Sequence, residues 1–245
     1  PIIAVRDNIF CAMSSNDSVV CLDASSGREK WKFYAEAPVR LTPTFFNGRL
    51  LFGSDDGFVY CLNASDGSLI WKHRLGPTAR RIPGNGRVIS AWPVRTGVLV
   101  DDKKAFFCAG LFPTQGTYQA AVDIETGREL ARGQINVSPQ GYLERRGGRL
   151  FVTTGRDPAG AFVSQLSRRG KGYGKEVRSI PNEFPFAFVG AGGVRFGGGD
   201  GKVAAFRVEN GKQIWSAEVD GKAHVMAVAR GRLLVSTDKG TVYCF

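Results

Sequence analysis

The stretch from residue 77 to residue 95 contains the residue types best suited to binding chemistry. It gathers arginines, an amide and a tryptophan in one place: Arg80, Arg81, Asn85, Arg87, Trp92 and Arg95. Guanidinium groups beside an aromatic ring suit carboxylates, phosphates or a peptide, and such residues often lie on loops held by a rigid scaffold. We therefore predict a candidate binding loop here. The alternative is a basic surface loop whose Trp92 fills a gap between two repeats. A second candidate segment runs from Leu111 to Tyr118 and carries Phe112.

The sequence offers little for catalysis or metal binding. His73 and His224 lie far apart, so a zinc site would have to recruit carboxylates or thiols. The paired aspartates, Asp55-Asp56 and Asp101-Asp102, fall at expected hairpin turns and do not form the oxygen cage that Ca²⁺ requires. The glycine-rich run at 190–199 opens no helix, so it does not indicate a phosphate-binding loop. We predict no catalytic residue, no metal ligand and no bound cofactor.

The cysteines are odd in number and sit in repeated apolar contexts: Cys11, Cys21, Cys61, Cys108 and Cys244. Such placement indicates small buried strand residues with free thiols rather than a disulfide framework. A bridge between Cys11 and Cys21 is the alternative, because these two could lie on neighbouring strands.

The net charge is +11 with a pI of about 9.7, which raises the question of a polyanion partner. The 33 lysines and arginines are spread along the whole chain, and only a few cluster. Scattered surface charge is therefore our interpretation, and a polyanion-binding surface is the alternative.

A repeated phrase organises the chain. Residues 21–31 read Cys-Leu-Asp-Ala-Ser-Ser-Gly-Arg-Glu-Lys-Trp, and residues 61–71, 121–131 and 205–215 repeat this order of residue types. In each copy a short apolar run is followed by a polar turn that ends in glycine and then by a second strand. Asx side chains and glycine suit such turns. A second and a third hairpin signal, such as Asn47-Gly48, precede the phrase.

Each repeat of about 40 residues therefore predicts four short antiparallel strands, the unit of a β-propeller blade. We predict one all-β propeller domain over 1–245 with six blade-equivalents: about 1–36, 37–76, 88–135, 136–181, 182–220 and a partial 221–245. The fourth is degenerate, with Arg168 to Lys175 where the turn phrase should be.

The phrase resembles the tryptophan-docking motif of pyrroloquinoline-quinone-type (PQQ-like) propellers. That family includes quinoprotein dehydrogenases and lipoprotein propellers of bacterial outer-membrane assembly. The resemblance implies that the tryptophan of one blade packs against the next. The positions that match this docking role are Trp31, Trp71, Trp215, Gly27, Gly67, Gly127 and Gly211. Ala131 stands where a tryptophan would be, so docking should be weaker around the third and fourth blades.

The dehydrogenases of this family hold their quinone near a ring of adjacent cysteines and a Ca²⁺ ion, and this chain has neither signal. We therefore expect a non-enzymatic scaffold that binds a protein partner or a small anionic ligand. The resemblance places it in the periplasm or elsewhere outside the bacterial cytoplasm, as a module of a larger protein. The alternatives are a quinone-binding quinoprotein and a polyanion-binding propeller.

The last repeat stops after three strands at Phe245, while Pro1 to Asp7 aligns with the first strand of its own blade. We expect further sequence in the native protein, two more blades completing an eight-bladed ring of the kind common in this family. The alternative is a six-bladed ring with a three-stranded last blade.

Overall fold

The computed structural model describes residues 1–84, 86–146, 149–154, 181 and 183–245. Regular structure in this part of the chain consists of β-strands and one short 3₁₀-helix, η1 (Pro113–Gln115), so the predicted all-β class is confirmed. The chain divides into two compact units. The larger unit spans Phe10–Arg169, and the smaller unit combines Pro1–Ile9 with Gly170–Phe245. Each unit has a hydrophobic core of its own.

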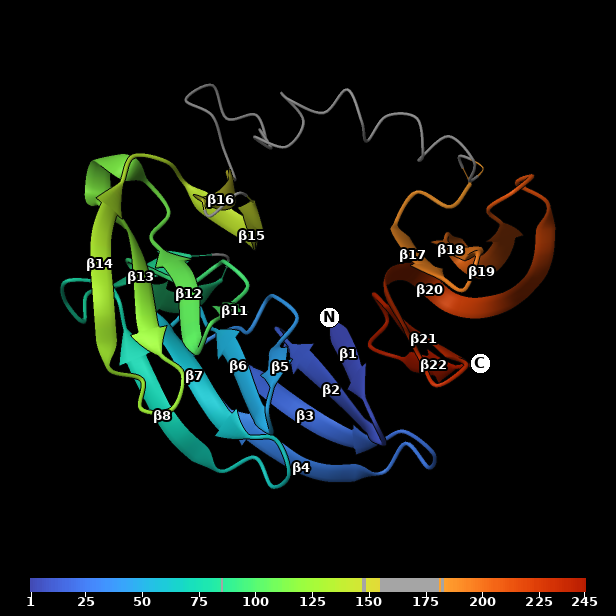
Figure 1. Cartoon of the computed structure of the whole chain (residues 1–245), viewed down its shortest axis with the longest axis horizontal. Coiled ribbons are helices and arrows are strands. Elements are labelled where there is room, and N and C mark those ends of the chain that lie inside the picture. Colours follow the sequence, from blue (N-terminus) through green and yellow to red (C-terminus); the bar gives the residue numbers. More distant parts are fainter. Residues whose placement is uncertain (85, 147–148, 155–180, 182) are drawn as a thin grey trace. The chain divides into compact units, whose positions relative to one another are not determined.

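Three four-stranded antiparallel sheets follow one another along the first 135 residues (Figure 1). Within each sheet, every strand pairs with the strand that follows it in the sequence. Tight turns join the strands, as at Asn47 and Gly48, which both have positive φ and suit the twist of a two-residue hairpin. The strands are β1 (Ile2–Val5), β2 (Asn8–Met13), β3 (Ser18–Asp23) and β4 (Glu29–Tyr34); β5 (Thr44–Phe46), β6 (Arg49–Gly53), β7 (Phe58–Asn63) and β8 (Leu69–Arg74); and β11 (Leu99–Asp101), β12 (Lys104–Ala109), β13 (Thr117–Asp123) and β14 (Glu129–Ile135).

Burial differs between the middle and outer strands of a sheet. In β6 the consecutive residues Leu50, Leu51 and Phe52 are all buried, which requires that both faces of the sheet be covered. In the outer strand β8 the pattern alternates and Trp71 alone is buried. The repeated tryptophan is thus the inward residue of a strand that otherwise faces solvent.

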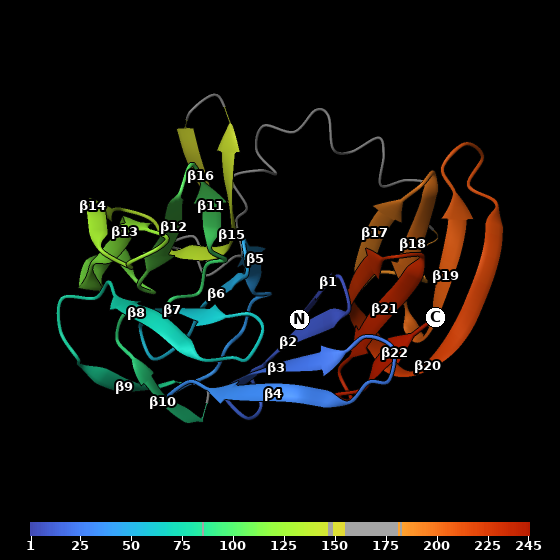
Figure 2. The same cartoon turned by 60° about the horizontal axis from the view of Figure 1, so that its bottom comes forward.

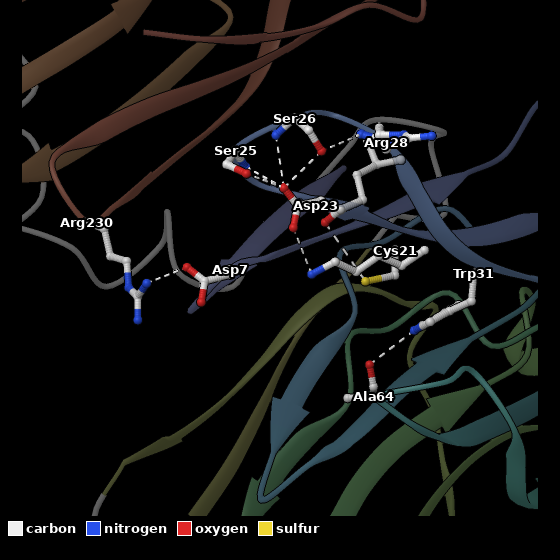
Figure 3. Close-up of polar contacts among 11 residues, drawn as sticks. Asp7, Cys21, Asp23, Ser25, Ser26, Arg28, Trp31, Ala64 and Arg230 are labelled. Atoms are coloured by element: carbon white, nitrogen blue, oxygen red, sulfur yellow. Dashed lines mark hydrogen bonds and ion pairs between the residues drawn. The ribbon is translucent and has the colours of Figure 1, made fainter.

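Two of the three predicted docking tryptophans are buried against the turn of the following sheet. The indole N–H of Trp31 donates to the carbonyl of Ala64 at 3.2 Å (Figure 3). The ring of Trp31 lies on Gly67. Trp71 repeats the contact one sheet later, donating to the carbonyl of Ile124 at 3.0 Å and lying on Gly127. A Cβ added at either glycine would lie 2.6 Å from the ring, so any larger residue at these positions would have to displace the tryptophan.

The remaining docking positions are less covered. Trp215 is only half-buried, and its ring lies 5.2 Å from that of Phe245. Gly211 has the same positive φ of 69° as Gly27. No atom lies within 4 Å of a Cβ built on Gly27. Ala131, at the position of the missing tryptophan, is exposed on β14.

The predicted fourth blade is described only at its start. There β15 (Pro139–Arg146) and β16 (Arg149–Thr154) form an antiparallel pair. The segment from Arg168 to Lys175, where a degenerate turn was predicted, lies outside the described residues.

The smaller unit contains a six-stranded sheet with strands in sequence order (Figure 1): β17 (Ala187–Ala191), β18 (Val194–Gly198), β19 (Asp200–Arg207), β20 (Gln213–Ala229), β21 (Arg232–Thr237) and β22 (Val242–Cys244). Its strand β20 pairs with β19 through its first half and with β21 through its second half. The boundary that we predicted between two blades near residue 220 falls inside β20, close to the point where its pairing changes from β19 to β21, and Gly221 there has a φ of 87°. Arg230, in the turn after β20, forms an ion pair with Asp7 (Figure 3).

All five cysteines are free thiols, as predicted. Four are buried, and burial raises the pKa to about 11 for Cys11 and Cys21 and to about 12 for Cys61 and Cys108. Cys244 lies in β22 and is exposed, which corrects the prediction that it is buried like its repeat counterparts.

Candidate functional site

The predicted binding loop at 77–95 contains a β-hairpin. Strand β9 (Arg81–Gly84) pairs with β10 (Arg87–Ser90), with Arg81 opposite Ser90 and Gly84 opposite Arg87. Gly86 supplies the positive φ of the turn, and Asn85 lies outside the described residues. The hairpin forms a two-stranded sheet separate from the four-stranded ones and lies near the end of β4 (Figure 2).

Two arginines tie this hairpin to neighbouring turns. Arg81 pairs with Glu36, just after β4. Arg87 donates to the carboxylate of Asp17 at 2.8 Å and to the carbonyl of Ser15, both between β2 and β3. The guanidinium of Arg80 is exposed, and among the described residues it has no ion pair or hydrogen bond.

Trp92 is buried in the core of the larger unit, not on its surface. Its indole N–H donates to the carbonyl of Gln115 at 3.0 Å, and its side chain lies on Gly76. This position fits the packing interpretation of Trp92 rather than the binding one. The hydrogen bond from Trp92 to Gln115 also links this segment to the connection between β12 and β13.

Arg95 lies apart from the hairpin arginines and binds a buried carboxylate. Its Nε and one terminal nitrogen donate to the two oxygens of Asp55, each at 2.9 Å. The side chain of Asp55 is 1% exposed, and it also accepts from Nε of Arg40 at 2.6 Å. Sequence reasoning treated Asp55 only as a turn residue and missed Arg40. The sequence signal for a second role of Asp55 was its doublet with Asp56, because a hairpin turn needs only one aspartate.

Asp56 holds the same turn from its other side. Its carboxylate accepts from the Tyr60 hydroxyl at 2.7 Å and from the backbone N–H groups of Glu36 and Phe58 at 3.1 and 2.9 Å. Burial raises the pKa of Asp56, because the charged form loses water. The aspartate doublet thus orders the turn at 54–57 and the connection after β4.

The second candidate segment lies beside the first. It contains η1 between Phe112 and Gly116, and the Phe112 side chain is 44% exposed. Tyr118 is half-buried, and its ring lies on Gly116. Because Trp92 donates to Gln115 within η1, the two candidate segments are held together.

Backbone hydrogen bonds join these segments into one surface, which we call the loop layer: residues 35–43, 54–57, 77–84 with 86–95, and 111–116. The N–H of Asp55 donates to Pro38 and that of Ser90 to Asp55, at 2.9 and 2.7 Å. Val94 donates to Ser54 at 3.0 Å, and Gly110 donates to Pro93 at 3.1 Å. All four segments lie in the larger unit. The predicted arginines therefore belong to a surface whose segments are joined by backbone hydrogen bonds.

The described residues offer no obvious place for a metal. They contain no group of three or more histidine, cysteine or carboxylate side chains that could hold an ion. His73 is accounted for by its contacts with Glu129, at 3.1 Å, and with the ring of Phe107. No helix in the described part of the chain is long and apolar enough to cross a membrane.

Comparisons with known proteins agree with the repeat analysis. The family model of the outer membrane protein assembly factor BamB matches residues 1–154 and 185–245. No curated protein matches the chain. The solved structure of BamB from Moraxella catarrhalis is similar to it with 16% identity and a TM-score of 0.50, covering 100% of this chain and 68% of that one.

Other solved structures match less well. The computationally designed protein Ika8 has 11% identity and a TM-score of 0.45, with 100% of this chain and 69% of that chain covered. The quinohemoprotein alcohol dehydrogenase from Comamonas testosteroni has 13% identity and a TM-score of 0.46, covering 100% and 40%. The BamB match confirms the predicted β-propeller fold built from PQQ-like repeats.

Proposed function

The chain belongs to the family of the outer membrane protein assembly factor BamB, and from that premise we propose that it is a non-enzymatic propeller scaffold that binds a protein partner through the loop layer. A periplasmic or otherwise extracytoplasmic location, within a larger protein, is part of the same proposal. It rests on the family, whose name refers to assembly at the outer membrane.

The observation that carries the proposal is the ordered loop layer with exposed binding groups. Arg81 and Arg87 are each held on one side by an acidic residue while their side chains remain 50% and 41% exposed. Arg80 and Phe112, which belong to the same layer, are also exposed. Arginine and aromatic residues are enriched at protein interfaces, and a surface ordered before binding loses less entropy when a partner arrives.

The charges of the loop layer suggest the partner's chemistry. The surplus guanidinium of Arg80 and the exposed faces of Arg81 and Arg87 favour a partner with acidic groups. The ring of Phe112 favours an apolar contact beside them. We therefore propose an acidic protein surface with an apolar centre as the partner.

Quantitative affinity capture tests this proposal. The immobilised chain would be incubated with an extract of source cells, next to a variant with Arg80→Glu and Phe112→Ala. The matched control carries Lys104→Glu and Leu130→Ala. Both residues are exposed: Lys104 is the first residue of β12 and Leu130 is the second residue of β14, at the ends of these strands away from the loop layer.

We expect the partner to be depleted at least tenfold on the loop-layer variant and retained on the control, because charge reversal and loss of the ring act at the contact itself. Equal capture by the two variants, or loss on the control alone, would contradict the proposed surface.

A quinone titration tests the non-enzymatic part. We expect added pyrroloquinoline quinone with Ca²⁺ to leave the absorption spectrum equal to the sum of its components. A saturable change in the quinone spectrum would overturn this part of the proposal and leave the protein-binding part to the capture experiment.

A further inference from the structure

The carboxylate of Asp55 holds two arginines and neutralises only one. Arg95 donates two hydrogen bonds to it and Arg40 donates one, at 2.6 to 2.9 Å. The carboxylate is 1% exposed, so water screens its interaction with the two guanidinium groups only weakly. The cluster therefore carries one surplus positive charge.

Donors remain on both guanidinium groups. Among the described residues, neither terminal nitrogen of Arg40 has an ion pair or hydrogen bond, and the same holds for the second terminal nitrogen of Arg95. The two side chains are 32% and 16% exposed. They are thus partly withdrawn from water yet reachable, and Coulomb attraction to an anion is stronger there than on an open surface.

An aromatic side chain contacts the segments that carry Arg40 and Arg95. Gly141 accepts from the N–H of Gly97 and donates to the carbonyl of Arg95, each at 2.9 Å. The next residue, Tyr142, lies on Gly97, where a Cβ would come within 2.7 Å of its ring. Its hydroxyl donates to Thr42 at 2.8 Å, while half of its side chain stays exposed.

These contacts place Tyr142 against Thr42 and Gly97, which lie two residues beyond Arg40 and Arg95 in the sequence, and leave half of its side chain exposed. Its hydroxyl already has a partner in Thr42, so the ring offers apolar surface rather than a further charge. Asp55 holds the guanidinium group of Arg95 through a two-point fork and that of Arg40 through one hydrogen bond.

We propose that Arg40 and Arg95 form a binding site for a carboxylate carried on an apolar or aromatic group. A guanidinium fork matches the planar geometry of a carboxylate, and a single surplus charge suits a monoanion better than a doubly charged phosphate. The Tyr142 ring would contact the apolar part. Arg40 and Arg95 belong to the loop layer, but this proposal uses neither Arg80 nor Phe112 and is tested without a protein partner.

Calorimetric titration of the whole chain tests the proposal, with benzoate as the probe and benzamide and inorganic phosphate as comparators. We expect benzoate to bind at least tenfold more tightly than either. Arg40→Gln should weaken benzoate at least tenfold. Arg28→Gln, which removes the same charge from an exposed arginine in the turn between β3 and β4, should leave benzoate binding unchanged.

The outcomes separate cleanly. Benzoate binding no tighter than benzamide binding, or unchanged binding by Arg40→Gln, overturns the site. Phosphate binding as tightly as benzoate overturns the carboxylate assignment. Arg40→Gln leaves Asp55 its two bonds from Arg95, so this variant retains the buried pair. A circular dichroism spectrum equal to that of the parent would confirm its fold.

Discussion

The indole of Trp71 is a residue-scale anchor of the larger unit, since it combines burial with a hydrogen bond to the next sheet. We expect Trp71→Ala to lower the free energy of unfolding by about 3–5 kcal/mol, because it leaves a cavity and an unpaired carbonyl. Trp215→Ala is the matched variant and should cost less, because Trp215 is already half-exposed. Urea denaturation followed by circular dichroism measures both. Equal losses would contradict the docking role of Trp71.

The thiols provide a second residue-scale prediction, with a pH dependence. Burial raises the pKa of Cys11 and Cys21 to about 11, so at pH 8 about one thousandth of each is the reactive thiolate. We expect a thiol-specific chromogenic reagent at pH 8 to label Cys244 rapidly in the native protein and all five cysteines after denaturation. Raising the pH toward 11 should accelerate labelling of the buried thiols.

The Cys244→Ser variant is the control for the rapid phase. Its native form should show no fast labelling, and its denatured form should give four equivalents. A fast phase that survives this substitution would show that one of the buried thiols is accessible.

At the residue scale, the sequence predicted which residues matter better than it predicted their roles. The spacing of Trp31 and Trp71 located two docking residues, because a repeated residue in a repeated fold keeps its environment. Trp92 has no repeat counterpart, so nothing in the pattern distinguished packing from binding. The pairing of Arg95 with Asp55 was not predictable, because it joins residues 40 positions apart whose approach depends on how two sheets pack.

Neighbouring four-stranded sheets are linked through the turn between the third and fourth strands of a sheet. Gly27 and Gly127 have the same φ of 69°, but Gly127 lies against the Trp71 ring and Gly27 has open space around it. We expect Gly27→Ala to cost about 1–2 kcal/mol of stability from backbone strain alone. Gly127→Ala should cost clearly more, since the added methyl also displaces Trp71. Thermal unfolding with tryptophan fluorescence measures the difference, and equal costs would refute this account of docking.

The same turn gives an element-scale pH prediction. Hydrogen bonds from the Thr126 hydroxyl and backbone N–H lower the pKa of Asp123 below its ordinary value. The folded pKa is therefore below the unfolded one. The stabilisation is complete above the unfolded pKa of about 3.9 and is lost as the pH falls through the folded value.

Asp123→Asn tests this, because Asn63 fills the same position in the preceding turn and accepts from Ser65 at 2.9 and 3.0 Å. We expect the variant to keep its fold and to lose less stability than the parent between pH 6 and pH 3. The measurement is the urea midpoint at both pH values. An unchanged pH dependence would show that Asp123 does not contribute to acid sensitivity.

Elements within a repeat were predictable, and those between repeats were not. The hairpin signals located the strands of the first three sheets, because strand alternation and Asn-Gly turns are local. The boundary predicted near residue 220 falls within β20, which pairs with β19 before that region and with β21 after it. The β9–β10 hairpin was read as a loop, because Pro83 in β9 argues against a strand.

For the whole molecule, fold and function follow from different information. The repeat predicts the propeller, and the match to the BamB family confirms it. The docking phrase says nothing about a partner, because it is consumed in holding the sheets together. Function must therefore be tested at surfaces that the docking phrase does not use. Among the described residues, the loop layer is the surface that we propose for this test.

Site-specific photo-crosslinking in source cells tests the central claim most directly, because a covalent adduct reports contact at a chosen position. Benzoylphenylalanine would replace Arg80 or Phe112 in the loop layer, and Lys104 or Leu130 as controls at the far ends of their strands. We predict a discrete adduct with the same protein from Arg80 and Phe112 and none from the controls. Adducts from the controls alone, equal adducts from all four positions, or none from the loop layer would contradict the claim that this surface binds a protein partner.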